Sequence, residues 1–120
     1  MTDFTTVVDR YLAVWNEPDE PTRRKAVDDL FADNIRYVDP LAAVEGREAL
    51  TALIGAVQQQ FPGHTFAPAG PVDGHHDQVR FTWALTATPG DPLVIGFDVA
   101  ELDTDGRIHQ VLGFIDKAPG

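Results

Sequence analysis

The segment VIGFDVAEL, residues 94–102, has the branched and aromatic composition of a β-strand, yet a carboxylate, Asp98, lies at its centre. An ionised carboxylate among apolar side chains is costly unless a cation pairs with it or several hydrogen bonds reach it. Otherwise burial raises its pKa and the group stays protonated. Because acids with perturbed pKa values cluster at functional sites, Asp98 is a candidate acid–base residue. The alternative is a solvated aspartate on an edge strand.

Two further side chains are candidates to share a site with Asp98. Asp39 alternates with Tyr37 in the strand IRYVDP, so it is expected to point inward, although an aspartate there could simply organise the turn before Leu41. Tyr11 lies on the apolar stripe of the first helix, where most tyrosines are core residues. Together, two carboxylates and a buried phenol are the set needed to move a proton next to a carbonyl. One ionised base takes the proton, and neutral donors stabilise the developing enolate.

Aromatic side chains are the candidates to line a pocket around these groups. Five are predicted to contact a bound molecule: Trp15, Tyr37, Phe61, Trp83 and Phe114. For any one of them the alternative is core filling, since a buried aromatic ring stabilises the fold wherever it lies. Trp83 and Phe114 are singled out because both are predicted on the sheet face that carries Asp98.

The residues that several other kinds of catalytic or metal site require are absent or poorly placed. The chain has no cysteine and no serine, which excludes disulfides, thiolate metal sites and serine nucleophiles. His75, His76 and Asp77 are potential metal ligands in a row, but neighbours on an extended chain point to opposite sides, so a polar hairpin loop is expected. No glycine-rich phosphate loop is present. We therefore expect a site without a metal or an organic cofactor.

The charge balance limits the partners. Nine Lys and Arg residues stand against 19 Asp and Glu residues, a net charge of −10, and no basic cluster occurs. A nucleic-acid backbone or an anionic membrane would be repelled. The first residues do not have the pattern of a targeting peptide, and no apolar stretch approaches about 18 residues. These features predict a cytoplasmic protein without nucleic-acid or membrane partners.

The elements that must position these residues follow from the spacing of apolar side chains. A single domain over residues 1–120 is predicted. Its first helix is capped by Thr2 or Asp3, and its last strands begin at His64, where the apolar period changes to two. The predicted elements are helices over about 4–15, 21–31 and 47–60, a strand over 35–40, and four antiparallel strands after His64. The fold class is α+β, with the helices on one face of a curved, mostly antiparallel sheet.

The register of the central hairpin can be predicted from side-chain sizes. A four-residue loop from Pro89 to Pro92 pairs Thr88 with Leu93. In the pairs that follow, large side chains are predicted opposite smaller ones: Leu85 with Gly96, Trp83 with Asp98, Phe81 with Ala100 and Val79 with Leu102. Arg80 then faces Glu101, an opposite-charge pair that supports the register. A one-residue slip would destroy both patterns.

The next hairpin is predicted to turn at Gly106, in the left-handed position of a three-residue loop. This turn would place Ile108, Leu112 and Phe114 on the side of the sheet that Asp98 shares. Asp98 would then face an aromatic wall.

The segments RYLAVWN, LFADNIRYVDP, EGREAL and GFDVAELDTDGRIHQVLGFID resemble the nuclear transport factor 2 superfamily. Within it, the chain most resembles the SnoaL-like polyketide cyclases and, at its polar residues, the ketosteroid isomerases. The resemblance covers residues from about Thr6 to Asp116. It implies a cone-shaped sheet wrapped on three N-terminal helices in the order α-α-β-α-β-β-β-β, a deep apolar pocket that takes a small hydrophobic molecule, and frequent homodimers.

The resemblance also implies roles. In the isomerases a tyrosine of the first helix, an aspartate before a proline and a strand aspartate carry catalysis, and these match Tyr11, Asp39 and Asp98 by position. Asp39 would be the base, and Tyr11 and Asp98 the donors. The further tyrosine that the isomerases carry on the third helix has no counterpart over residues 49–60. In the cyclases an acid–base aspartate works in the pocket, and Asp98 is its counterpart.

These features favour a cofactor-independent enzyme of the isomerase or cyclase type that moves a proton on a hydrophobic carbonyl or polycyclic molecule. A non-catalytic ligand-binding or dimerisation module of the same fold is the alternative. Water activation, as in epoxide hydrolases of this fold, would need an arginine between two acids inside the cavity. A homodimer is expected from the resemblance, and the apolar Ile95, Phe97 and Val99, predicted on the sheet face away from Asp98, agree with it.

Overall fold

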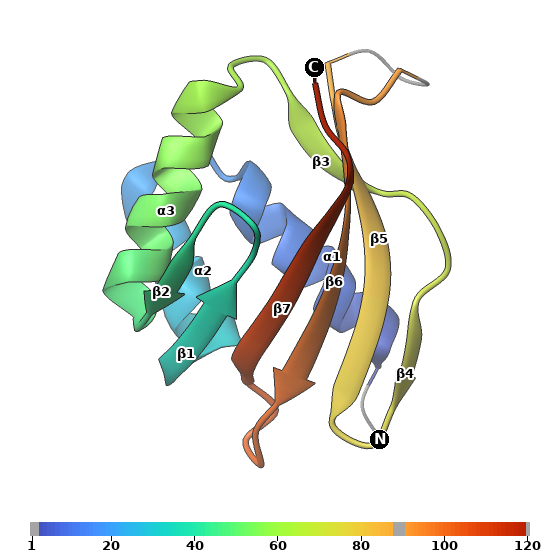
Figure 1. Ribbon diagram of the computed structural model, residues 1–120. Helices are drawn as coiled ribbons and strands as arrows, with labels where there is room; N and C mark the ends of the chain where they lie inside the picture. Colours follow the sequence, from blue (N-terminus) through green and yellow to red (C-terminus); the bar gives the residue numbers. More distant parts are fainter. Residues whose placement is uncertain (1–2, 88–90, 120) are drawn as a thin grey trace.

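A computed structural model describes residues 3–87 and 91–119 of the chain. These residues form three helices that lie on one side of a curved, mixed sheet of seven strands (Figure 1). In chain order the elements are α1 (Phe4–Asn16), α2 (Glu20–Leu30), β1 (Phe31–Val38), β2 (Ala43–Glu45), α3 (Arg47–Gln60), β3 (Thr65–Pro68), β4 (Asp73–His75), β5 (Gln78–Thr86), β6 (Val94–Leu102) and β7 (Ile108–Lys117). The predicted α+β class and the order of its main elements are confirmed. The three-residue strands β2 and β4 come in addition.

The strand order places β6 inside the sheet. Neighbouring strands follow the order β2-β1-β7-β6-β5-β3, and β4 pairs with β5. The pair of β1 with β7 is parallel, and the other pairs are antiparallel. Asp98, in the middle of β6, is only 2% exposed. The alternative of a solvated aspartate on an edge strand is therefore wrong.

The helix starts follow the capping signals of the sequence. The Asp3 carboxylate accepts a hydrogen bond from the Thr6 amide at 3.1 Å and caps α1. Asp19 caps α2 in the same way, and Pro21 lies in its first turn. Thr2, Thr88 and Pro89, which enter the predicted cap and hairpin loop, lie outside the described residues. None of the helices in the described part of the chain has the length and apolar character needed to cross a membrane.

Strand β1 begins earlier than predicted. The chain leaves α2 at Leu30 and enters the sheet at Phe31, which is fully buried and pairs with Ile108 of β7. The alternation of apolar residues predicts the strand only from Ile35. The difference arises because a buried aromatic residue after a helix suits the last helical turn and a first strand position equally well.

The hairpin of β5 and β6 differs from the predicted register by two residues. Phe81 lies opposite Asp98, Trp83 opposite Gly96, and Val79 opposite Ala100. All four predicted pairs are therefore wrong. Because side chains alternate with a period of two, the shift leaves every side chain on its predicted face, and Trp83 shares the face of Asp98.

Two contacts explain this register. A Cβ atom at residue 96 would overlap the Trp83 ring, so the glycine makes room for the indole. The predicted pair of Arg80 with Glu101 is also wrong. Arg80 lies opposite Val99, and its Nε donates to the Asp73 carboxylate at 3.1 Å.

The hairpin of β6 and β7 confirms one prediction and overturns another. Gly106 has φ +81°, the predicted left-handed conformation. The pairing then shifts between Leu102 and Glu101, so that His109 is an extra residue in β7. This bulge reverses the alternation. Val111, Gly113 and Ile115 share the face of Asp98, whereas Leu112 and Phe114, predicted on that face, lie on the other, and Phe114 is 57% exposed.

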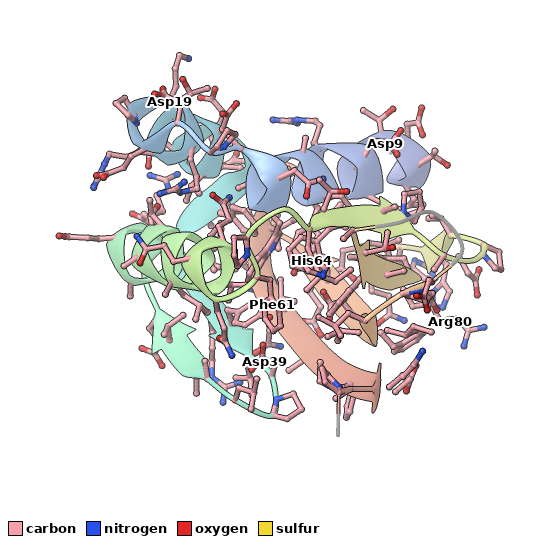
Figure 2. The ribbon with its side chains drawn as sticks, turned by 90° about the horizontal axis from the view of Figure 1, so that it is seen from above. Asp9, Asp19, Asp39, Phe61, His64 and Arg80 are labelled. Carbon is pink, nitrogen blue, oxygen red and sulfur yellow. The ribbon has the colours of Figure 1, made fainter. Side chains whose placement is uncertain are left out.

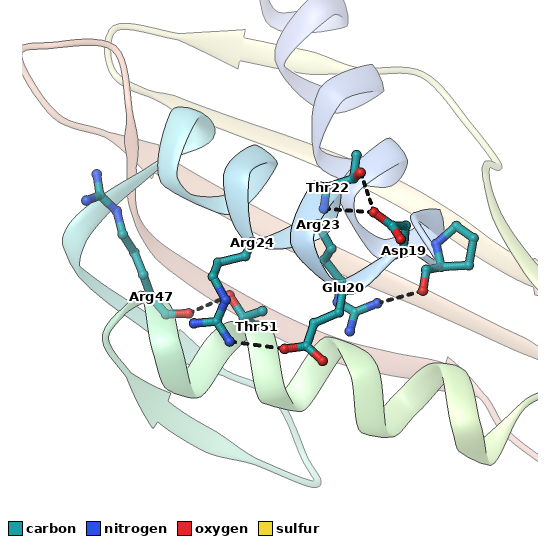
Figure 3. A network of polar contacts seen from close by, with 8 residues as sticks. Asp19, Glu20, Thr22, Arg23, Arg24, Arg47 and Thr51 are labelled. Atoms are coloured by element: carbon teal, nitrogen blue, oxygen red, sulfur yellow. Dashed lines mark hydrogen bonds and ion pairs between the residues drawn. The ribbon is translucent and has the colours of Figure 1, made fainter.

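A buried arginine, Arg23, ties α2 to α3. Figure 3 shows Arg23 on α2 with the hydrogen bond from its Nη1 to the Pro18 carbonyl. Arg23 is 7% exposed, and its Nη1 donates to the Glu17 carbonyl at 3.0 Å and to Gln58 Oε1 at 3.3 Å. Gly55 leaves space for the guanidinium, since a Cβ atom there would lie 3.0 Å from Arg23 Nη2. These contacts fix α3 against the end of α1, and both helices line the cavity described next.

Candidate active site

A cavity of about 530 Å³ lies between the helices and the sheet. This volume is within the usual range of small-molecule sites. Four of the five aromatic residues predicted to contact a ligand, Trp15, Tyr37, Phe61 and Trp83, line it, and Phe114 does not. The lining residues are Tyr11, Leu12, Trp15, Tyr37, Asp39, Pro40, Leu41, Val57, Gln60, Phe61, Phe66, Trp83, Leu85, Val94, Asp98, Ile115, Ala118 and Pro119. The wall is mainly apolar, with two carboxylates and two phenols.

Asp98 and Tyr11 form one buried unit in this wall. The Tyr11 hydroxyl donates to Asp98 Oδ2 at 2.9 Å, and each residue is 2% exposed. Burial raises the pKa of Asp98 to about 6, hydrogen bonds from Tyr11 and Trp83 lower it, and the nearby charge of Asp39 raises it. Asp98 therefore titrates close to neutral pH.

Both tyrosines of the site remain protonated. Burial raises the pKa of Tyr11 well above its ordinary value, and the charge of Asp98 raises it further. The pKa of Tyr37 is raised for the same two reasons and by its hydrogen bond to Asp39. Each phenol consequently acts as a donor toward its carboxylate.

Asp39 has a different set of contacts. Its Oδ1 accepts from the backbone amides of Leu41 and Ala42, each at 2.8 Å, and its Oδ2 accepts from the Tyr37 hydroxyl at 2.7 Å. Asp39 thus organises the turn after β1, as the alternative interpretation of the sequence predicted. It also lines the cavity. In the picture of Figure 2, Asp39 is drawn lower than Phe61, another residue of the cavity wall.

Gly113 lies between the two carboxylates. A Cβ atom on it would lie 2.8 Å from Asp98 Oδ1 and 3.2 Å from the Asp39 Cβ. Gly113 is not among the site residues predicted from the sequence, although an isolated glycine within a strand pattern signals a close approach of neighbouring groups. The glycine allows the two aspartates to face the same cavity.

The arrangement argues against the epoxide-hydrolase type of chemistry. None of the described residues that line the cavity is an arginine or a lysine. Arg80, the candidate cation, is paired with Asp73 outside the cavity, and its side chain is 63% exposed. Among the described residues no group of three or more His, Cys, Asp or Glu side chains could hold a metal ion, and His75 and His76 lie at the turn between β4 and β5.

Comparisons with known proteins agree with this fold. A family model described as a SnoaL-like domain matches residues 8–111. A solved structure from Agrobacterium tumefaciens str. C58, provisionally named an isomerase of the SnoaL-like family, is 46% identical, with 97% of this chain and 99% of that chain covered and a TM-score of 0.91.

More distant structures share the fold. One from Jannaschia sp. CCS1, provisionally named a SnoaL-like polyketide cyclase, is 20% identical, with 97% of this chain and 90% of that chain covered and a TM-score of 0.72. Another from Sinorhizobium meliloti, provisionally named a polyketide cyclase, is 19% identical, with coverages of 92% and 94% and a TM-score of 0.69. No curated protein matches the chain. The family match and the 46% identity show that the chain belongs to the SnoaL-like domain family.

Proposed function

We propose that this protein is a cofactor-independent acid–base catalyst, of the isomerase or cyclase type, that moves a proton within a hydrophobic carbonyl compound. The observation that carries the proposal is the 2.9 Å hydrogen bond from the Tyr11 hydroxyl to Asp98 inside a mainly apolar cavity. An acid with a pKa of about 6 is ionised at neutral pH, yet it is basic enough to take a proton from carbon and return it.

The contacts favour Asp98 as the group that takes the proton. Three donors already reach the carboxylate of Asp39, two of them backbone amides that hold it in a turn. Asp98 instead accepts its hydrogen bond from the Tyr11 hydroxyl, a side chain of the cavity wall, and the Trp83 side chain also lowers its pKa. This division differs from the one that the isomerase resemblance implies, in which Asp39 is the base. In our proposal Asp39 supplies a nearby negative charge that keeps Asp98 basic.

Two observations weigh against the non-catalytic alternative. That alternative predicts a collapsed interior in which Tyr11 and Asp98 bond only to the backbone. The described residues instead line a cavity of about 530 Å³, and the two side chains bond to each other. The provisional name of the Agrobacterium tumefaciens relative, an isomerase, is in line with proton transfer.

Exchange of carbon-bound hydrogen for deuterium tests the proposal. We expect the protein to accelerate exchange next to the carbonyl of a bicyclic ketone such as 2-decalone in D₂O, followed by NMR. Asp98→Asn should reduce this rate by about 10²–10⁴-fold, the usual contribution of a general base. Asp9→Asn, on the exposed side of α1, is the matched control and should keep the rate. A folded Asp98→Asn variant that exchanges at the wild-type rate would refute the assignment.

We further propose that two copies associate through the outer face of β6 and β7. Phe114, which is 57% exposed, pairs with Phe97 there, and Leu112 pairs with Val99. Phe114→Glu should therefore convert a dimer into a monomer in sedimentation equilibrium, because it would bury a charge in the interface. Ala52→Glu, on the exposed face of α3, is the control for added charge. A wild-type protein that is monomeric at tens of micromolar would contradict the proposal.

A further inference from the structure

The cavity that contains Asp98 holds negative charge without a cation to balance it. Asp39 and Asp98 both line it, and none of the described lining residues is a lysine, an arginine or a histidine. Within the described part of the chain, neither aspartate forms an ion pair. Lys117, which precedes the lining residue Ala118, has an exposed side chain that donates to the Pro92 carbonyl at 3.0 Å. Because charges inside proteins are normally paired, this cavity is suited to a cation that arrives with the ligand.

The hydrogen bonds to the two aspartates do not remove their charge. Asp39 accepts from two backbone amides and from the Tyr37 hydroxyl, and Asp98 accepts from the Tyr11 hydroxyl. All of these donors are neutral. The two side chains also lie close together, because a Cβ atom on Gly113 would lie 2.8 Å from Asp98 Oδ1 and 3.2 Å from the Asp39 Cβ. One cationic group in the cavity would therefore interact with both carboxylates.

Aromatic rings line the same cavity. They belong to Tyr11, Trp15, Tyr37, Phe61, Phe66 and Trp83. Neighbouring rings are tilted and not stacked: the planes of Trp15 and Tyr37 meet at 45°, and those of Phe66 and Trp83 at 70°. The face of an aromatic ring carries partial negative charge and attracts a cation, and alkylated ammonium groups are the usual ligands of sites built from several such rings. Rings and carboxylates together favour an organic cation over an inorganic one.

We propose that the ligand of this cavity is a hydrophobic amine, bound as its ammonium cation, with the positive charge between Asp39 and the rings of Tyr37 and Trp15. The Tyr37 hydroxyl donates to Asp39 Oδ2 at 2.7 Å, and the centroids of the Tyr37 and Trp15 rings are 5.5 Å apart, so carboxylate and rings adjoin one another. Asp39 is half-buried, whereas Asp98 is 2% exposed. A cation beside Asp39 therefore keeps more of its hydration than one beside Asp98, and it leaves Asp98 available for proton transfer.

The ligand is then a hydrophobic ketone that also carries a basic nitrogen, a class that rests on the proposed function and makes it more specific. The net charge of −10 attracts such a cation to the protein and repels an acid. A ligand with a free carboxylate would add a further negative charge to a cavity that already contains two carboxylates and no described cation. Ketones with a free carboxylate are therefore the class that the cavity rejects.

Binding of matched ketones tests the ligand class independently of turnover. Tropinone is a bicyclic ketone whose tertiary amine is protonated at neutral pH, and bicyclo[3.2.1]octan-3-one has the same ring frame with CH₂ in place of the N-methyl bridge. In calorimetry at pH 7 and low salt, wild-type protein should bind tropinone about 10-fold more tightly. It should bind 4-oxocyclohexanecarboxylate more weakly than the methyl ester of that acid.

Asp39→Asn tests the position of the cation. This variant removes the charge and keeps a side-chain oxygen that can accept from the amides of Leu41 and Ala42. It should reduce the preference for tropinone about 3-fold to 10-fold and leave the affinity for the carbon analogue nearly unchanged. Asp9→Asn, which removes one carboxylate from the exposed side of α1, is the matched control and should keep the preference.

A second readout locates the amine directly. The N-methyl protons of bound tropinone should shift upfield in NMR, because they would lie against the faces of aromatic rings. They should also give nuclear Overhauser effects to the ring protons of Tyr37 and Trp15. Overhauser effects to neither ring would overturn the proposed position.

The ligand class and the proposed function can fail separately. An Asp39-dependent preference for tropinone, without exchange next to the carbonyl of any ketone, would uphold the ligand class and refute the catalytic proposal. Exchange of 2-decalone that requires Asp98, together with equal affinities for the two bicyclic probes, would uphold the function and overturn the ligand class. No binding of tropinone, a preference that Asp39→Asn leaves unchanged, or tighter binding of the carboxylate than of its ester would also overturn it.

Discussion

Replacement of Asp98 by asparagine should change the stability of the protein in a way that depends on pH. In the folded state the pKa of Asp98 is about 6, whereas an unfolded aspartate titrates near 3.9. Below about pH 4 Asp98 is protonated in both the folded and the unfolded state, so it imposes no ionisation penalty on the stability of the fold. As the pH rises from about 4 to about 6, the unfolded state loses its proton first, so the free energy of unfolding falls. Above about pH 6 the full penalty is present.

The size of the effect follows from the two pKa values. A difference of about two pKa units corresponds to about 3 kcal/mol, an order-of-magnitude figure for a group that is almost fully buried. Asparagine does not ionise, so the variant escapes the penalty. The stability of Asp98→Asn relative to wild type should therefore rise by about 3 kcal/mol between pH 4 and pH 8. The loss or rearrangement of the Tyr11 bond adds an offset that is nearly the same at both pH values.

Urea denaturation at the two pH values measures this difference. Asp9→Asn is the matched control, because it removes one carboxylate from an exposed position on the helix that carries Tyr11. The control variant should differ from wild type by nearly the same amount at pH 4 and pH 8. If Asp98→Asn differs from wild type in stability by the same amount at both pH values, burial does not shift the pKa of Asp98. A relative stability that falls with pH would mean that its pKa is lowered in the folded state.

Three further predictions concern the site and its support. The kcat/KM for proton exchange should rise about tenfold per pH unit below about pH 6 and level off above it, since Asp98 must be ionised; a rate that falls through this range would contradict a basic Asp98. Gly113→Ala should slow proton exchange while it changes the melting temperature little, because the new Cβ would lie 2.8 Å from Asp98 Oδ1 and displace that oxygen. An unchanged exchange rate would exclude this effect. Gly96→Ala should destabilise the protein by about 1–3 kcal/mol in urea denaturation, because the new methyl group would overlap the Trp83 ring; wild-type stability would show that the ring moves freely.

The sequence was sufficient to predict which face of the sheet carries Asp98. It was insufficient to predict that Asp98 lies opposite Phe81. Alternation with a period of two fixes the face, and the error of two residues in the register did not change it. The register depends on how many residues the turn between β5 and β6 uses, and a local pattern does not determine that number. The glycine that makes room for Trp83 could have been paired with it on size alone.

The bulge in β7 shows a second limit. The segment IHQVLGFI, residues 108–115, has apolar residues at both even-numbered and odd-numbered positions, so either set could form the inner face of the strand. The extra residue at His109 selects the phase with Val111 and Ile115 inside and leaves Phe114 outside. That choice is made by packing against the rest of the sheet, which explains why Phe114 was wrongly predicted to contact the ligand.

The candidate site was predictable as a set of residues but not as a set of bonds. Helical spacing and strand alternation brought Tyr11, Asp39 and Asp98 toward one interior, where all three line the cavity. The pairing of Tyr11 with Asp98 and of Tyr37 with Asp39 depends on side-chain directions across distant elements.

Direct titration of the Asp98 carboxyl carbon by ¹³C NMR tests the central claim, that this buried carboxylate is tuned by its cavity to act near neutral pH. The resonance can be assigned by its absence in Asp98→Asn. Its midpoint should lie at about 6 in the wild-type protein and higher in Tyr11→Phe, because the lost hydrogen bond favours the ionised form. A midpoint near 4 in the wild-type protein, or one that Tyr11→Phe leaves unchanged, would contradict the account.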